Sequence, residues 1–246
     1  MATVDANALL LQVMAHDLLA PLTAVKWQIE IMQSDDKDAV RQAERLKSIY
    51  AATELGIVLT KHAHVAGRVL VGSYEEEPVT AALPTVVRDA LFDLKGQYER
   101  HGLPLVVRVD EQYEVQHVID VHLVQLFVWA LAKYFLTCTP AHVTVEYVGV
   151  STPSAHGKGR FFTFTGTATG VPEAGEYARL CTTREARDAY DQAFVFAKLL
   201  ATVAPLIGAT VEASAEGDRL TIEAIFEHPG LQANEEPRGY ARVVSG

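Results

Sequence analysis

The sequence lacks the features that mark several large classes of protein. Its two cysteines, Cys138 and Cys181, have no metal-ligand spacing, so we expect two reduced, buried thiols. The net charge of −10 argues against sequence-independent nucleic-acid binding, which relies on neutralising phosphates. No apolar run approaches the ~20 residues that span a bilayer, and the N-terminus carries Asp5 where a signal peptide would be basic. We therefore expect a cytoplasmic protein that binds neither nucleic acid nor membrane.

Two long helices are predicted at the start of the 246-residue chain, over residues 5–34 and 37–70, on either side of a short acidic turn. The first helix carries a heptad seam, in alternating steps of four and three, made of Leu11, Ala15, Leu18, Leu22, Val25, Ile29 and Met32. The second has a seam rich in small residues: Ala43, Leu46, Ile49, Thr53, Gly56, Thr60 and Ala63. Because two antiparallel helices cannot bury these faces alone, we predict a homodimer in which two hairpins form a four-helix bundle.

The pattern changes after the polar run Gly72–Pro78, which we interpret as a linker. Helices are predicted over 83–100, 121–136 and 190–204. Strands are predicted over 103–109, 113–118, 142–148, 160–165, 210–215 and 219–226. The fold class is α + α/β: a helical hairpin over residues 1–74, a linker over 75–80, an α/β sandwich over 81–228 and a flexible tail over 229–246.

His16 lies beside the seam of the first helix, is followed by Asp17, and precedes Pro21 and Leu22. This stretch resembles the phospho-accepting box of bacterial sensor histidine kinases, which has the form His-acid-x-x-x-Pro-Leu. A proline inside a helix costs roughly 3 kcal/mol and normally persists for a functional reason. The resemblance assigns phospho-acceptance to His16, and Asp17 would orient its ring or accept its other N–H. The alternative is that both are ordinary solvated helix residues.

The later elements resemble the ATP-binding domain that follows the histidine helices in sensor kinases. That domain holds Mg²⁺ through an asparagine on a helix, and the matching helix has Lys133 or Ala130 there, depending on the register. Its adenine-reading aspartate corresponds to Gly166, and its first glycine to Ala168. The Gly-x-Gly pair that cradles phosphates falls on Ala193 and Val195. We therefore expect no ATP-driven autophosphorylation and no cofactor bound by this chain.

A phosphorylatable histidine without a nucleotide site resembles the bacterial histidine phosphotransferases of the ChpT type. This resemblance implies a dimer that relays phosphoryl groups between receiver domains of response regulators and hybrid kinases, with Mg²⁺ supplied by the receiver. Kinases that also dephosphorylate their regulators carry Thr or Asn four residues after the histidine. Ala20 stands there, so we expect little phosphatase activity. Two alternatives stay open: a non-catalytic binding module, and an unorthodox ATP-using kinase.

Helical spacing also predicts the docking surface for a receiver. Leu19, Ala20, Thr23 and Trp27 follow His16 in steps of three and four, on a stripe outside the seam. An exposed Leu and Trp beside the histidine suit a helix of a partner protein. The alternative is that Trp27 packs inside the protein, against the second helix or the α/β sandwich.

Overall fold

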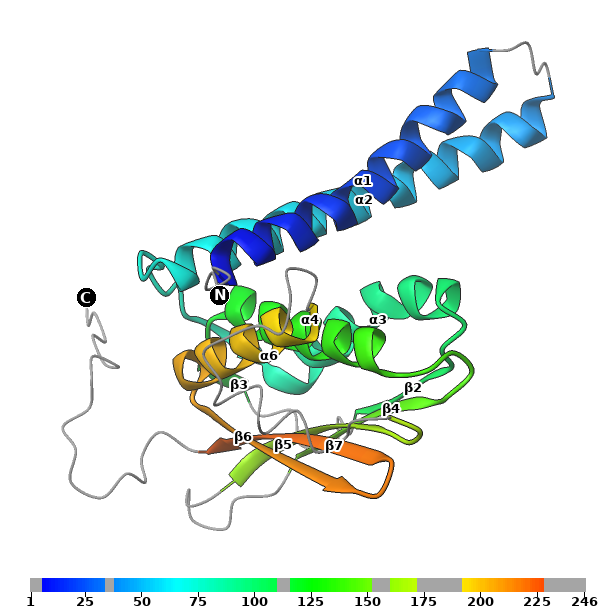
Figure 1. Cartoon of the computed structure of the whole chain (residues 1–246). Coiled ribbons are helices and arrows are strands. Elements are labelled where there is room, and N and C mark those ends of the chain that lie inside the picture. The colour runs from blue at the N-terminus through cyan, green and yellow to red at the C-terminus, as the bar shows by residue number, and fades with distance from the viewer. Residues whose placement is uncertain (1–5, 34–37, 110–115, 152–159, 172–191, 228–246) are drawn as a thin grey trace, which may run out of the picture.

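A helical hairpin lies across an α/β sandwich in the computed structural model of the chain (Figure 1). The structure describes residues 6–33, 38–109, 116–151, 160–171 and 192–227. The three longer helices of the sandwich form one layer, with the hairpin above it and a sheet below it (Figure 1). Cys181, Pro172 and the predicted tail lie outside the described residues.

The hairpin consists of α1 (Ala6–Gln33) and α2 (Ala39–Leu70), close to the predicted bounds. Asp38 caps α2, because its Oδ1 accepts a hydrogen bond of 2.9 Å from the amide of Val40. Helix α1 continues through Pro21, whose side chain is buried. The hairpin rests on the sandwich through contacts of α1 with α6 and of α2 with α4 and α6.

The sandwich follows the predicted order of elements. Its helices are α3 (Leu83–Arg100), α4 (Val121–Cys138), α6 (Gln192–Val203) and the short 3-10 helix η1 (Ala204–Ile207). Its strands are β1 (Val79–Ala82), β2 (Leu105–Val109), β3 (Gln116–Ile119), β4 (Val145–Ser151), β5 (Arg160–Ala168), β6 (Ala209–Glu216) and β7 (Arg219–Glu227). The larger sheet has the order β2-β4-β5-β7-β6 and is mixed, because β2 and β4 are parallel and the other neighbours antiparallel.

Helix α4 is the core of the molecule. Twelve of its residues are buried, and α3 and α6 pack against it. By length and composition alone it is the one helix in the described ranges that could cross a membrane, yet most of it is buried inside the fold. Such burial is expected of a helix in the core of a folded domain. At its C-terminus Cys138 is half-buried, and burial raises the pKa of the thiol to about 12.

Asp120 fastens the predicted linker to this core helix. Its Oδ1 caps α4 by accepting from the amide of Leu123 at 3.0 Å. Its Oδ2 accepts from the hydroxyl of Tyr74 at 2.9 Å and from the amide of Glu77 at 2.8 Å. Burial and this hydrogen bond raise the pKa of Tyr74. The linker is therefore held at two points by one carboxylate.

Several predicted strands differ from the structure by two or three residues at their ends, and two differences have a clear physical reason. The end of the predicted linker is already strand β1, which pairs with β3 in a separate two-stranded sheet that the sequence pattern did not indicate. The strand predicted from His142 begins at Val145 instead. His142 has a backbone φ of 70°, a left-handed conformation outside the range of strands.

Candidate functional site

His16 stands on α1 where the hairpin passes over the sandwich. Its side chain is 76% exposed, so the imidazole is open to another molecule. Asp17 is the next residue on the helix, and its Oδ1 lies 3.5 Å from Nδ1 of His16, somewhat longer than the ~2.7–3.2 Å of a typical N–H···O hydrogen bond. With the proton placed on Nδ1, this contact leaves Nε2 unprotonated. The structure therefore brings together the two residues that the sequence predicted as a pair.

A residue of the sandwich completes this group. The Nζ of Lys133, on α4, forms an ion pair with Oδ2 of Asp17. The lysine side chain is only 10% exposed and that of Asp17 only 17%, in contrast to the open imidazole beside them. The two oxygens of one carboxylate thus face two different partners: Oδ1 faces His16 and Oδ2 faces Lys133.

A cavity of about 420 Å³ opens beside these three residues, between the hairpin and the sandwich. Its lining residues come from α1, α2, α3 and α4 and include the adjoining His101: His16, Asp17, Ala20, Pro21, Ala24, Ser48, Ala51, Ala52, Leu55, Leu59, Gln97, Arg100, His101 and Lys133. Asp17 is the only acid among them, whereas Arg100 and Lys133 are cationic. The cavity beside the histidine is therefore lined mainly by apolar and basic side chains.

The predicted docking stripe lies open on α1. Leu19, Ala20, Thr23 and Trp27 are all exposed, as is His16. At 3.6 residues per turn these five side chains share one face of the helix, away from the buried face that holds Leu10, Val13, Met14 and Pro21. The alternative in which Trp27 packs inside the protein is not seen, because its side chain is 67% exposed.

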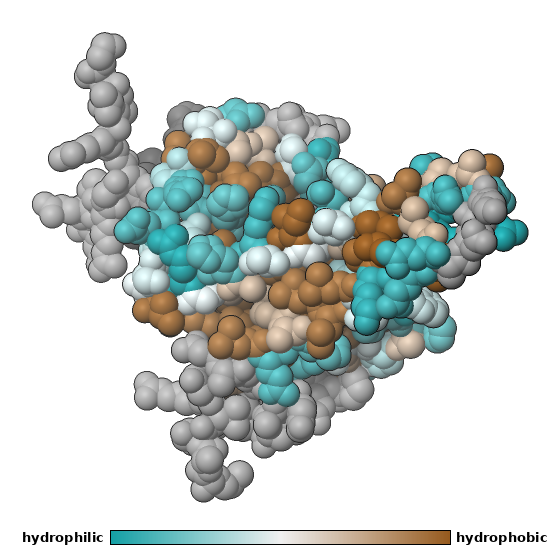
Figure 2. Space-filling view, turned by 90° about the horizontal axis from the view of Figure 1, so that it is seen from above, coloured by the Kyte–Doolittle hydropathy of each residue, from teal (hydrophilic) through white to brown (hydrophobic). Residues whose placement is uncertain are grey.

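The heptad seam of α1 is divided between two environments. Leu18, Val25 and Met32 are half-buried, whereas Leu11 and Leu22 are 67% and 60% exposed and Ala15 and Ile29 are also exposed. Helix α2 also has an exposed row at steps of three and four: Ala43, Leu46, Tyr50, Thr53, Ile57 and Thr60. It differs in part from the predicted seam, because Ile49, Gly56 and Ala63 are half-buried. Figure 2, which looks down on the hairpin, shows hydrophobic residues gathered among polar ones on this side of the molecule. Among the residues that the structure describes, a large apolar part of the hairpin has no partner.

Gly166, which the resemblance aligns with an adenine-reading aspartate, has no room beside it for a side chain. Gly166 lies on β5, and a Cβ built on it would lie 2.8 Å from Cε2 of Phe135 and 2.9 Å from Cε1 of Tyr147. Real Cβ atoms essentially never approach other atoms so closely, so no side chain fits without displacing these rings. The space beside Gly166 is filled by the aromatic core.

The other two aligned positions offer no nucleotide ligand among the described residues. Lys133 is paired with Asp17, and an ammonium group has no acceptor to give a metal ion. Ala130 in the other register is buried and has no polar side-chain atom. Val195 on α6 is buried in the core and carries a β-branched side chain where a phosphate-cradling glycine is expected. The described residues at these positions do not fit Mg-ATP.

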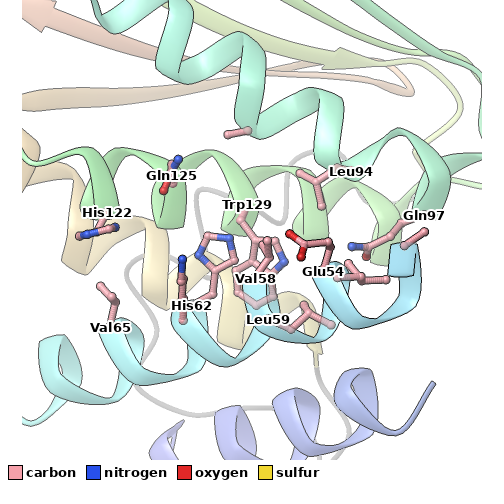
Figure 3. Close-up of a pocket in the computed structure, with 14 residues that line it drawn as sticks. Glu54, Val58, Leu59, His62, Val65, Leu94, Gln97, His122, Gln125 and Trp129 are labelled. Atoms are coloured by element: carbon pink, nitrogen blue, oxygen red, sulfur yellow. The ribbon is translucent and has the colours of Figure 1, made fainter. Parts of the chain in front are cut away.

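A second cavity, of about 270 Å³, separates α2 from α3 and α4 (Figure 3). His62 projects into it from α2 and stacks on Trp129 of α4, with ring centroids 5.3 Å apart and planes inclined by 21°. Burial, followed by the charges of His122 and Lys61, lowers the pKa of His62 to about 4. In the part of the chain that the structure describes, no three His, Cys, Asp or Glu side chains are grouped as metal ligands.

Sequence reasoning placed Lys133 only as a residue that cannot bind Mg²⁺, and missed its contact with Asp17. One signal could have pointed to it. Lys133 is the only Asp, Glu, Lys or Arg in the otherwise apolar α4. A lysine is almost never buried unless it is paired, so such a residue implies an acidic partner elsewhere in the fold.

Comparison with known proteins gives a likeness of fold. No protein-family model and no curated protein matches the sequence. Among solved structures, a bacterial phosphotransferase has a TM-score of 0.50 and 14% identity, covering 91% of this chain and 97% of that one. The histidine kinase AdeS of Acinetobacter baumannii has a TM-score of 0.47 and 11% identity, covering 87% of this chain and 98% of that one. Full-length ShkA in complex with AMPPNP has a TM-score of 0.49 and 14% identity, covering 89% of this chain and 46% of that one. At this identity the likeness concerns the fold alone, which this chain shares with the bacterial phosphotransferase.

Proposed function

We propose that this protein is a cytoplasmic histidine phosphotransferase of the ChpT type, which relays phosphoryl groups between receiver domains through His16 and does not use ATP. The observation that carries the proposal is the open imidazole of His16 beside the carboxylate of Asp17, on the hairpin of a histidine-kinase-like fold. The unfit nucleotide positions at Lys133, Gly166 and Val195 favour a relay over a kinase.

The transfer requires little covalent chemistry from the protein itself. The lone pair of His16 Nε2 attacks the phosphorus of an aspartyl phosphate on the receiver and forms a P–N bond. The P–O bond to the receiver aspartate breaks, and its electron pair leaves with the carboxylate. The ring gains positive charge while Nδ1 keeps its proton, and the carboxylate of Asp17 offsets that charge. The receiver would bring its own Mg²⁺, which neutralises the phosphoryl oxygens.

The second transfer is the same step in reverse, from His16 to the aspartate of another receiver. Each receiver, whether of a response regulator or of a hybrid kinase, would dock on the stripe of Leu19, Ala20, Thr23 and Trp27, which is exposed beside the imidazole. Ala20 has no polar atom to orient a water molecule, so the phosphoryl group is retained during the relay.

The functional unit would be a homodimer. The exposed apolar rows of α1 and α2 are spaced like the core positions of a helix bundle. A second copy would cover them and form a four-helix bundle, leaving the docking stripe open because it lies on another face of α1.

The test uses two phosphodonors on the full chain, with His16→Ala as the inactive variant and His64→Ala as a matched control at an exposed histidine of α2. Receiver domains from the same organism, charged with labelled acetyl phosphate, should label the wild type and the control but not His16→Ala. Labelled ATP with Mg²⁺ should label none of them. Label from ATP on His16 would establish a kinase. Receiver binding without label on any variant would establish a non-catalytic binding module.

A further inference from the structure

The ion pair between Lys133 and Asp17 joins two parts of the fold at the side of His16. Lys133 projects from α4, the core helix of the sandwich, and Asp17 belongs to α1 of the hairpin. Figure 1 shows α4 lying in the helical layer directly beneath the hairpin. The contact is therefore made between the sandwich and the hairpin.

The surroundings of the pair give it a defined geometry. Both side chains are largely shielded from water, so each needs the other's charge, and breaking such a pair leaves an uncompensated buried charge. Asp17 is the only acid lining the adjoining cavity, which Lys133, Arg100 and His101 of the sandwich also line. A carboxylate fixed at Oδ2 has little freedom to rotate its other oxygen away from His16.

We propose that Lys133 is a positioning residue for phosphotransfer: it fixes the Asp17 carboxylate so that Oδ1 accepts the Nδ1 proton of His16 and Nε2 faces the incoming phosphorus. The inference rests on the proposed function, because it concerns the same imidazole. It assigns a role in the transfer step to the one charged residue of α4. It also makes the reactivity of His16 depend on the sandwich being seated against the hairpin.

Phosphoramidate tests this role without any receiver, because it phosphorylates imidazoles directly. We expect Lys133→Met to slow phosphorylation of His16 by roughly tenfold, since a misplaced reacting group commonly costs one to two orders of magnitude. Lys133→Arg keeps a cation and should restore most of the rate. Lys95→Met, at an exposed lysine of α3, should leave the rate unchanged. Circular dichroism checks that each variant is folded.

A double-variant comparison separates positioning from simple docking. In an Asp17→Asn background, Lys133→Met should have no further effect on the rate, because Lys133 acts only through Asp17. An equal loss of rate in that background would overturn the proposal and assign Lys133 to docking alone.

The tautomer of His16 gives a second measurement, first in the wild type and then in Lys133→Met. Long-range ¹H–¹⁵N NMR spectra should show the proton on Nδ1, and Lys133→Met should redistribute it between the two nitrogens. A proton on Nε2 in the wild type would overturn the proposal. If phosphoramidate labels His16 as expected but no receiver exchanges phosphoryl groups with it, the relay fails while the positioning role stands.

Discussion

His62, buried between the hairpin and the sandwich, leads to a prediction of how the free energy of unfolding changes with pH. His62 is 9% exposed, stacks on Trp129, and has its pKa lowered from 6.5 to about 4, mainly by burial. Between these two values the unfolded chain takes up a proton that the folded chain does not. Stability is therefore fully present above pH 6.5 and is lost as the pH falls toward 4.

The size of the effect follows from the shift. At about 1.4 kcal/mol per pKa unit, His62 contributes a loss of roughly 3 kcal/mol by pH 4, of which about 2 kcal/mol falls between pH 7 and pH 5. A loss of this size is a large share of the 5–15 kcal/mol that is typical of folded proteins. Protonation acts on the contact between α2 and α4, so the hairpin should loosen from the sandwich in the same pH range.

Urea unfolding followed by circular dichroism at pH 7 and pH 5 measures this loss. His62→Phe keeps a ring against Trp129 but carries no titrating proton, so its free energy of unfolding should fall by about 2 kcal/mol less than that of the wild type. His64→Gln, two residues further along the same helix and exposed, should follow the wild type. If His62→Phe loses as much stability as the wild type, protonation of His62 is not the cause.

Three further predictions test the core, the linker and the bundle. Gly166→Ala should destabilise the fold by about 1–3 kcal/mol, because its Cβ would meet two core rings. Gly96→Ala, on the open surface of α3, should instead stabilise it by up to about 1 kcal/mol. Thermal unfolding measures both, and equal effects would show that the space beside Gly166 is not filled. Asp120→Ala removes a helix cap and two hydrogen bonds to the linker, so we expect the free energy of unfolding in urea to fall by about 3 kcal/mol. A fall below about 1 kcal/mol would show that other contacts hold the linker. Leu22→Glu places a charge in the exposed apolar row of α1 and should convert a dimer to a monomer in analytical ultracentrifugation. Leu19→Glu, on the docking stripe, should leave the mass unchanged. A dimer with both variants would place the interface elsewhere.

Much of the fold could be predicted because local signals agreed with one another. The range 83–100 was predicted as a helix and is helical over the same residues, since an amphipathic pattern and a proline in its first turn coincide. Strand β1 was missed because it is only four residues long and its pairing with β3 is a tertiary contact. The heptad seam of α1 was recognisable, but its division into half-buried and exposed halves depends on where α2 and the sandwich lie.

The candidate site was predictable only where its residues are neighbours in the sequence. His16 and Asp17 are adjacent in the sequence, and the exposed stripe that begins at His16 follows from helical spacing. Lys133 is far from them along the chain, and nothing local identifies the carboxylate that it meets. The sequence shows only that a partner is needed, because a charge in an apolar helix requires an opposite charge when the helix is buried.

The need of a buried charge for an opposite charge also explains how the ion pair can link folding to reactivity. A single charge on α4 is stable inside the protein only when α1 supplies Asp17, so seating the hairpin on the sandwich and orienting the carboxylate are one event. Replacing both residues by apolar ones should preserve the seating, since buried ion pairs are often no more stabilising than hydrophobic contacts. The pair Asp17→Leu and Lys133→Met should therefore fold with stability near that of the wild type, yet transfer phosphoryl groups slowly. A double variant that relays at the wild-type rate would show that the ion pair serves only to hold the two parts together.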